Sequence, residues 1–295
     1  MKALFIVNPR AGASDRVRKI TEAVRKVLKG EEGIFKIRVT KDPSGAGTLA
    51  EEAVRRGYDI VFACGGDGTV SGAASRLVNT STVLGIIPLG SGNAFAKALS
   101  IPGDAEACLE MLKKWKIKRV DAGVIAGRHF FSTAGLGFDA HLSKVYNEGR
   151  LSRRIRGIAP YFPLSVIEFY RYRPKEVTIR IGNEVIRETP FLLTAANTET
   201  YGGDAVIAPG ACPDDGLLDL CIVPETGLIS AMGLAKKLFN GAISSVREYR
   251  CVRASSIDIS VNGSAVLLQA DGEPFEHRGD ISITVEHKAL KVLVN

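Results

Sequence analysis

The stretch from Val61 to Ser75 reads VFACGGDGTVSGAAS, an apolar run that ends in three glycines around a single aspartate. The apolar run predicts a buried strand, and the small residues from Val70 onward predict a helix. A strand, a glycine turn and a helix in this order direct backbone N–H groups toward an anion. The stretch therefore predicts a phosphate site in an α/β fold.

Two well-known phosphate motifs are missing from the sequence. The Walker spacing Gly-x-x-x-x-Gly-Lys-Ser/Thr does not occur, and the run Gly90 to Phe95 lacks the last glycine of the dinucleotide fingerprint. A phosphate would have to be held in another way.

The chain has two parts that differ in their pattern of predicted strands and helices. In residues 1–122, short β-like runs at 2–7, 35–40, 58–64 and 83–88 alternate with amphipathic helical runs, which predicts a mostly parallel, Rossmann-like sheet. From residue 123 to 287, short β runs are separated by Gly, Pro and Asn, which predicts an antiparallel β-sandwich interrupted by helical segments at 150–172 and 229–239. The tail, residues 288–295, is expected to return to the first domain.

Composition places the chain among soluble globular proteins. It has 295 residues, of which 45% are hydrophobic and 24% charged, enough for two ordinary domains. Neither a signal peptide nor a run of roughly 20 apolar residues is found, so we expect a cytoplasmic protein. Five cysteines without a Cys-x-x-Cys pair and four histidines without ligand spacing indicate neither a disulfide framework nor a transition-metal site.

Positive charge is concentrated in one segment. The net charge is +7, and Lys144 to Lys175 holds eight basic residues against two acidic ones. Interleaved aromatic and basic residues are not repeated along the chain, so an acidic substrate or an anionic membrane surface is favoured over nucleic acid. The run RLSRRIR at 150–156 precedes aromatic and aliphatic residues up to 172, which could form the mouth for an acyl chain. A solvated basic face over a packed helix explains the same pattern.

Four clusters combine a β run with small and polar residues: VNPRAG (7–12), CGGDGT (64–69), PLGSGNA (88–94) and ADGEP (270–274). The first three are expected to meet at the carboxyl edge of one sheet, where nucleotides bind. In this order, NPRAG, GGDGT, PLGSGNAFA and DGE resemble the diacylglycerol kinase catalytic family, which includes bacterial lipid kinases and sphingosine and ceramide kinases. The resemblance spans nearly the whole chain, although GGDGT also occurs in NAD kinases.

The resemblance implies an ATP-dependent, Mg²⁺-requiring lipid kinase that acts between an ATP-binding domain (1–122) and a lipid-substrate domain (123–287). The acceptor would be a hydroxyl of diacylglycerol, of a sphingoid or ceramide-like lipid, or of another long-chain alcohol. A place in phospholipid biosynthesis, peripheral contact with the inner face of the membrane and a homodimer are further expectations. An NAD kinase and a non-catalytic nucleotide or lipid sensor remain the alternatives.

An ATP site follows from the resemblance, residue by residue. It would be lined by Asn8, Pro9, Arg10, Ala11, Gly12, Thr40, Gly66, Asp67, Gly68, Thr69, Val70, Ser71, Gly72 and Ser91. Glycines leave room for phosphate, and the helix start adds positive potential. Because Asp67 would repel bare phosphate, we expect Mg²⁺ between them, directly or through water. A role for Asp67 as a turn residue or helix cap stays open.

Three further positions are implied. Glu273 is the expected base for the lipid hydroxyl, and Asp121 would hold metal-bound water or the acceptor alcohol. Without the resemblance, a simple hairpin acid is the favoured interpretation of Glu273, and Asp121 could be a linker acid. The run CPDDGLLD resembles a structural Mg²⁺ loop, with the Asp215 carboxylate and the carbonyls of Cys212 and Leu217 as ligands.

The sequence departs from the diacylglycerol kinase pattern at two positions. Ala94 stands where NDFA would place an aspartate, and Gly72 stands where glutamate is common. The spelling GSGNA instead looks like that of sphingosine and ceramide kinases. The identity of the acceptor is therefore open.

Overall fold

The computed structural model describes residues 1–9, 15–30, 32–42, 44–148, 161–202, 204–262 and 265–295. The chain divides into two units. Unit 1 comprises Met1–Ala122 and Lys288–Asn295, and unit 2 comprises Gly123–His287. Two strands belong to both units, β5 (Lys116–Ile125) and β16 (Ile281–Val294).

Unit 1 is built on a parallel sheet with the strand order β2-β1-β3-β4-β16, in which the end of β16 lies parallel to β4. Its other strands are β1 (Lys2–Val7), β2 (Ile34–Val39), β3 (Ile60–Gly65) and β4 (Val83–Pro88). Every residue of β3 and β4 is buried, as expected for strands covered on both faces. The outer strand β2 has a largely exposed pattern.

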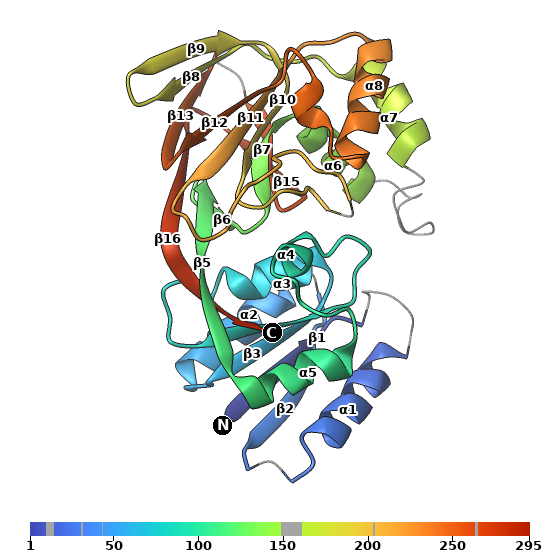
Figure 1. The fold of residues 1–295 in the computed structure, drawn as a ribbon, viewed down its shortest axis with the longest axis vertical. Helices are drawn as coiled ribbons and strands as arrows, with labels where there is room; N and C mark the ends of the chain where they lie inside the picture. The colour runs from blue at the N-terminus through green and yellow to red at the C-terminus, as the bar shows by residue number, and fades with distance from the viewer. Residues whose placement is uncertain (10–14, 31, 43, 149–160, 203, 263–264) are drawn as a thin grey trace. The chain divides into compact units, whose positions relative to one another are not determined.

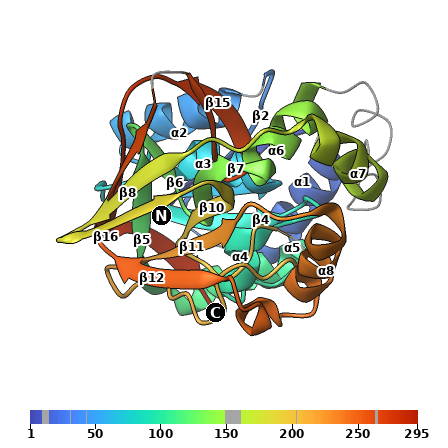
Figure 2. The same cartoon turned by 90° about the horizontal axis from the view of Figure 1, so that it is seen from above.

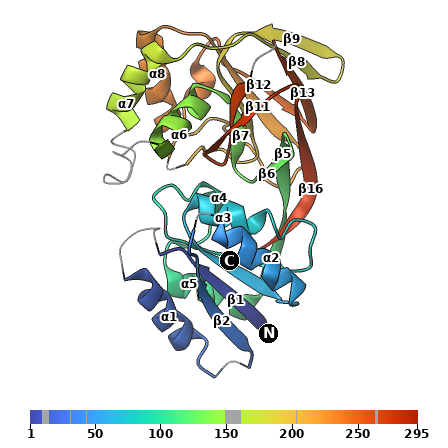
Figure 3. The same cartoon turned by 180° about the vertical axis from the view of Figure 1, so that it is seen from behind.

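Helices cover both faces of this sheet (Figures 1 and 3). They are α1 (Arg16–Val27), α2 (Gly45–Arg55), α3 (Asp67–Ala74), α4 (Ala94–Ala98) and α5 (Ala105–Lys114). Helix α1 packs against α5, and α2 packs against α3. The side chain of Asp104 caps α5 by accepting the N–H of Ala107 at 3.0 Å.

Unit 2 is a β-sandwich. One sheet has the order β12-β11-β10-β7-β14-β15, and β16, β13, β8 and β9 pair in that order in the other, where β6 pairs with β5. The strands are β6 (Arg128–Phe130), β7 (Thr133–Gly137), β8 (Val177–Ile181), β9 (Glu184–Glu188), β10 (Pro190–Ala196), β11 (Leu218–Pro224), β12 (Arg250–Ala254), β13 (Ser256–Val261), β14 (Val266–Ala270) and β15 (Glu273–His277). A hydrophobic cluster that includes Leu136, Ile179, Leu220 and Ile257 joins the two sheets.

Three helices cover the outer face of the six-stranded sheet (Figure 2). They are α6 (Phe138–Glu148), α7 (Tyr161–Arg171) and α8 (Leu228–Phe239), and a short 3₁₀ turn follows at Ile243–Ser245. Helices α7 and α8 occupy segments predicted to be helical. Helix α6 was not predicted, because it follows β7 directly at Gly137 without a loop that would separate the two patterns.

The predicted fold class is confirmed: unit 1 carries a mostly parallel α/β sheet and unit 2 an antiparallel sandwich. Within the described residues, every helix is too short or too polar to cross a membrane. The predicted basic run at 150–156 lies outside the described residues, as do Arg10, Ala11 and Gly12.

Candidate functional site

Two glycine loops meet at the carboxyl edge of the sheet in unit 1. Strands β3 and β4 are adjacent and in register, with Gly65 opposite Pro88, so the loops that follow them are neighbours. A Cβ atom at Gly90 would lie 2.7 Å from the Cα of Gly66. A side chain at Gly90 would thus clash with backbone, which explains the glycine there.

The Asp67 carboxylate ties these loops together. Its two oxygens accept the backbone N–H groups of Asn93 and Ala94, each at 2.8 Å, and so cap the start of α4. Asn93 has a left-handed φ of 53° and accepts the N–H of Gly90 at 3.0 Å through its own Oδ1. The helix-cap interpretation of Asp67 is therefore correct, with the cap on α4. Each carboxylate oxygen can accept a second hydrogen bond, so a metal-bound water still fits.

Asn8 links the end of β1 to the same loops. Its backbone N–H donates to the carbonyl of Cys64 at 3.0 Å, and its Nδ2 donates to Thr69 Oγ1 at 3.0 Å. Thr40 lies at the end of β2, is buried, and donates its N–H to Val7. Three strand ends thus converge with the glycine loops, as the sequence predicted.

The remaining predicted ATP-site residues in unit 1 differ in accessibility. Pro9, Gly68 and Ser91 are exposed, whereas Val70 is buried in the core. Ser71 and Gly72 are half-buried in α3. The carbonyl of Gly72 faces α2, because a Cβ on Gly47 would lie 3.0 Å from it. Gly72 is therefore a helix-packing position.

Arg16 is a residue that the sequence patterns did not identify. Its guanidinium donates to the carbonyl of Leu89, immediately before Gly90. A cation therefore stands beside the second glycine loop. The available signal was its position, four residues after the VNPRAG cluster at the start of a helix.

Asp121 is completely buried in unit 1. Its carboxylate accepts the N–H of Lys288 at 2.6 Å, where the returning tail has a left-handed φ of 51°. This contact gives Asp121 a structural role. The predicted role beside the acceptor alcohol stays a prediction.

In unit 2, Glu273 stands at the end of a tight hairpin between β14 and β15. Asp271 and Gly272 form its turn with φ values of 47° and 82°, the left-handed pair of a type I′ turn. Glu273 is exposed as the first residue of β15. Its carboxylate is thus accessible to a substrate, in agreement with a base and with a simple hairpin acid alike.

Asp271 is the residue of this motif whose role sequence reasoning missed. Its carboxylate accepts the N–H groups of Phe131, Ser132 and Thr133 at 2.8 to 3.3 Å. The hairpin is therefore fixed to the segment that leads into β7. The signal was its place two residues before Glu273, but its partners lie about 140 positions away in the sequence.

A polar pair, the buried Gln269 and the half-buried Asp139, supports the hairpin from within unit 2. Gln269 accepts the N–H of Gly272 at 2.9 Å and donates to Asp139 Oδ2 at 3.2 Å. Burial raises the pKa of Asp139 to about 6, although hydrogen bonds from Ala140 and Gln269 favour its charged form. The series of hydrogen bonds from Asp139 through Gln269 thus ends at Gly272, one residue before Glu273.

In the predicted structural Mg²⁺ loop, the Asp215 carboxylate is paired with a basic side chain. Asp215 accepts the N–H of Leu217 at 3.0 Å with one oxygen, and its other oxygen contacts the Arg253 guanidinium. The thiol of Cys212 contacts Asp214. A metal ion at this loop would share the Asp215 carboxylate with Arg253, because each carboxylate oxygen can accept a second contact. Among the described residues, clusters of three or more His, Cys, Asp or Glu side chains suited to a metal ion are absent.

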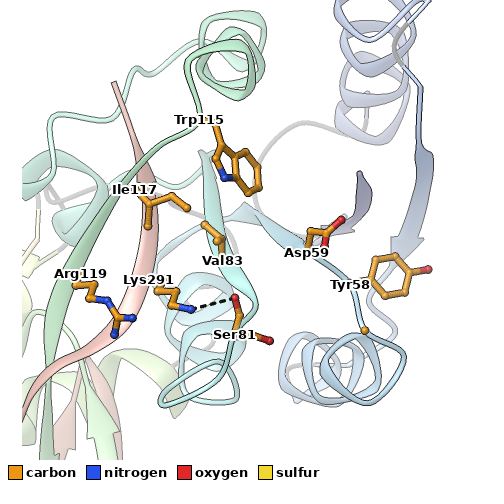
Figure 4. A pocket seen from close by; sticks show the side chains of 9 residues that line it. Tyr58, Asp59, Ser81, Val83, Trp115, Ile117, Arg119 and Lys291 are labelled. Atoms are coloured by element: carbon orange, nitrogen blue, oxygen red, sulfur yellow. Dashed lines mark hydrogen bonds between the residues drawn. The ribbon is translucent and has the colours of Figure 1, made fainter.

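A pocket of about 600 Å³ lies at the opposite end of the unit 1 sheet (Figure 4). It is lined by Trp115, Ile117 and Arg119, and Lys291 donates to the carbonyl of Ser81 at 3.5 Å beside it. Asp59 and Val83 mark the amino ends of β3 and β4. The glycine loops follow the carboxyl ends of these strands, roughly 20 Å away along the sheet. The pocket is therefore separate from the candidate site.

The parallel sheet with its glycine loops and the antiparallel β-sandwich each match a known family. Residues 2–125 match the family model described as diacylglycerol kinase catalytic domain. Residues 132–294 match the model described as YegS C-terminal NAD kinase beta sandwich-like domain. The chain belongs to the family of diacylglycerol kinases and YegS-like lipid kinases.

Relatives and solved structures agree with this assignment. A diacylglycerol kinase from Mycobacterium tuberculosis is 29% identical over 279 residues, covering 92% of this chain and 88% of its own. A YegS-like lipid kinase from Chromohalobacter salexigens is 32% identical over 216 residues, covering 72% and 68%. A solved structure of a candidate diacylglycerol kinase from Bacillus anthracis has a TM-score of 0.82 at 25% identity, covering 100% and 95%.

Proposed function

We propose that this chain transfers the γ-phosphate of ATP to a hydroxyl group of a lipid. The observation that carries the proposal is the pair of glycine loops in unit 1, which Asp67 and Asn93 hold together at the carboxyl edge of the sheet. Bare backbone and the start of α3 offer N–H groups to phosphate oxygens, and Arg16 adds a positive charge. Membership in a kinase family supports ATP as the phosphate donor.

In this proposal Glu273 accepts the proton of the lipid hydroxyl. The hydroxyl oxygen forms a bond to the γ-phosphorus while the bond between that phosphorus and the ADP oxygen breaks. The exposure of Glu273 and the support of its hairpin by Asp271 and Gln269 favour this role. Bound Mg²⁺ would neutralise phosphate charge, and Asp67 is suited to hold it through water. Unit 1 would bind ATP and unit 2 the lipid.

The acceptor is a long-chain alcohol. Diacylglycerol is supported by the names of relatives, and a sphingoid or ceramide-like lipid is supported by Ala94 in the GSGNA spelling. We place the reaction at the cytoplasmic face of the membrane, in phospholipid biosynthesis. Binding to that face would be peripheral.

The direct test incubates the purified protein with labelled ATP, Mg²⁺ and a mixed lipid extract, and identifies the product by mass spectrometry. We expect a labelled phospholipid that disappears when EDTA removes the metal. Formation of NADP from NAD at a rate above lipid phosphorylation would instead establish an NAD kinase. ATP binding without any labelled product would establish a sensor.

A further inference from the structure

Two helices of unit 2 expose apolar side chains on their outer surface. Helices α7 and α8 lie at the same edge of unit 2 in all three views (Figures 1, 2 and 3) and pack against one hydrophobic cluster. Six of the twelve exposed large hydrophobic side chains of the described residues belong to them. We call this set the α7–α8 face: Val166, Ile167, Tyr170, Ile229, Met232 and Phe239.

The outward residues alternate with inward ones at helical spacing. On α8, Leu234 is packed inside at 5% exposure, whereas Ile229 and Met232 are 87% and 59% exposed. On α7, Phe169 packs inward, and Ile167 and Tyr170 are 54% and 64% exposed. Each helix is therefore apolar on both sides, although only one side contacts the core. An apolar surface of this kind marks an interaction site.

Charge around the α7–α8 face is positive. Helix α8 contains Lys236 and Lys237 and lacks acidic residues. The single carboxylate of α7, on Glu168, is buried and lies 2.9 Å from both His141 and Arg171. Arg173 is exposed just after α7.

Two acidic residues lie on the flank of α8. Glu225 and Glu248 lie in a pocket on the flank of α8, where Lys237 and Arg247 balance them. The surface that surrounds the exposed apolar residues thus favours an anionic partner.

We propose that the α7–α8 face docks on an anionic lipid bilayer. Ile229, Met232 and Ile167 enter the boundary between headgroups and acyl chains, and Lys236 and Arg173 contact lipid phosphates. An apolar face with basic flanks is the combination that binds at such an interface. A second copy of this chain fits less well, because the basic residues of the two copies would face the same surface across a symmetric contact. The docking deepens the proposed function, on which it rests for its purpose: it brings the enzyme to a lipid acceptor.

The test is sedimentation with vesicles of phosphatidylcholine mixed with phosphatidylglycerol. The double variant Ile229→Glu, Met232→Glu is expected to bind at least about tenfold more weakly than the native chain, because two apolar side chains become charged. The control is Val185→Glu, which charges a residue that is 57% exposed on β9 and is expected to bind normally. Lys236→Gln should weaken binding roughly fivefold on these vesicles and leave binding to pure phosphatidylcholine unchanged.

Activity separates this proposal from the proposed function. Phosphorylation of a detergent-dispersed lipid by the double variant should match that of the native chain, which also shows that the variant is folded. Native-like vesicle binding by the double variant would overturn the docking proposal. So would a native dimer in gel filtration that the double variant converts to a monomer. If the native chain binds vesicles but phosphorylates no lipid, the proposed function fails and the docking surface stands.

Discussion

Asp67 in unit 1 and Asp271 in unit 2 each precede a glycine, and each accepts backbone N–H groups from a segment that is distant in the sequence. Asp67 holds the start of a helix, 26 and 27 positions away, whereas Asp271 holds three consecutive residues at the point where the chain enters β7. Both are braces. The chemistry we propose belongs to their neighbours: bare backbone beside Asp67, and the Glu273 carboxylate beside Asp271. An aspartate in a glycine motif can thus fix the backbone of a site through hydrogen bonds, while neighbouring groups carry out the proposed chemistry.

Removal of the brace in unit 2 is expected to lower the free energy of unfolding more than removal of the brace in unit 1. Asp271→Ala would leave three N–H groups without an acceptor at Phe131, Ser132 and Thr133, all of them buried residues. It would also place alanine at a left-handed φ. We expect a loss of about 3 to 5 kcal/mol of unfolding free energy in urea titrations. Asp271→Asn, which keeps an acceptor and tolerates this φ, should recover part of it; equal losses in both variants would argue against the brace.

Support of the same hairpin should depend on pH. The pKa of Asp139 is about 6 in the folded chain, against the ordinary value of 3.8, so the folded state keeps the proton longer than the unfolded state. Stability should therefore fall by roughly 2 to 3 kcal/mol as the pH rises from about 4 to about 6. Urea unfolding of Asp139→Asn should lose this slope, and the exposed control Asp258→Asn should keep it. A slope that survives in Asp139→Asn would contradict the assignment.

The brace in unit 1 is expected to contribute less. Asp67→Ala removes the cap of α4 and should cost about 1 to 2 kcal/mol. Asp104→Ala removes the side-chain cap of α5 and serves as a matched control of similar cost. ATP-dependent lipid phosphorylation should fall only in Asp67→Ala. Equal activity in the two variants would reduce Asp67 to an ordinary cap.

The smallest effect is expected at Gly72. A Cβ atom there would lie 3.8 Å from the Cβ of Ala46, an ordinary contact between α3 and α2. Gly72→Ala should therefore stabilise the chain by about 0.5 to 1 kcal/mol, the usual gain in a helix interior. Thermal melting measures it. A loss of ATP binding in this variant would show that Gly72 faces the nucleotide, as predicted.

Local sequence patterns predicted much of the fold, because strands such as β1, β3 and β4 are continuous buried runs with glycine turns behind them. They also placed the glycine loops at one edge of the sheet. They could not predict the partners of Asp67, Asp271 or Asp215, because each carboxylate is bound by groups whose proximity depends on tertiary packing. Helix α6 was missed because β7 passes into it without a break. Arg16 was missed because its contact with Leu89 spans 73 positions.

Glu273 is the base in the proposed phosphoryl transfer, and one pair of variants tests this role most directly. Phosphoryl transfer from ATP to lipid is measured for Glu273→Gln and for Glu276→Gln, which changes an exposed glutamate on the other face of the same strand. We expect kcat to fall at least about 100-fold in Glu273→Gln with ATP binding unchanged, and to stay near the native value in Glu276→Gln. A Glu273→Gln variant that phosphorylates lipid within about fivefold of the native rate would contradict the account.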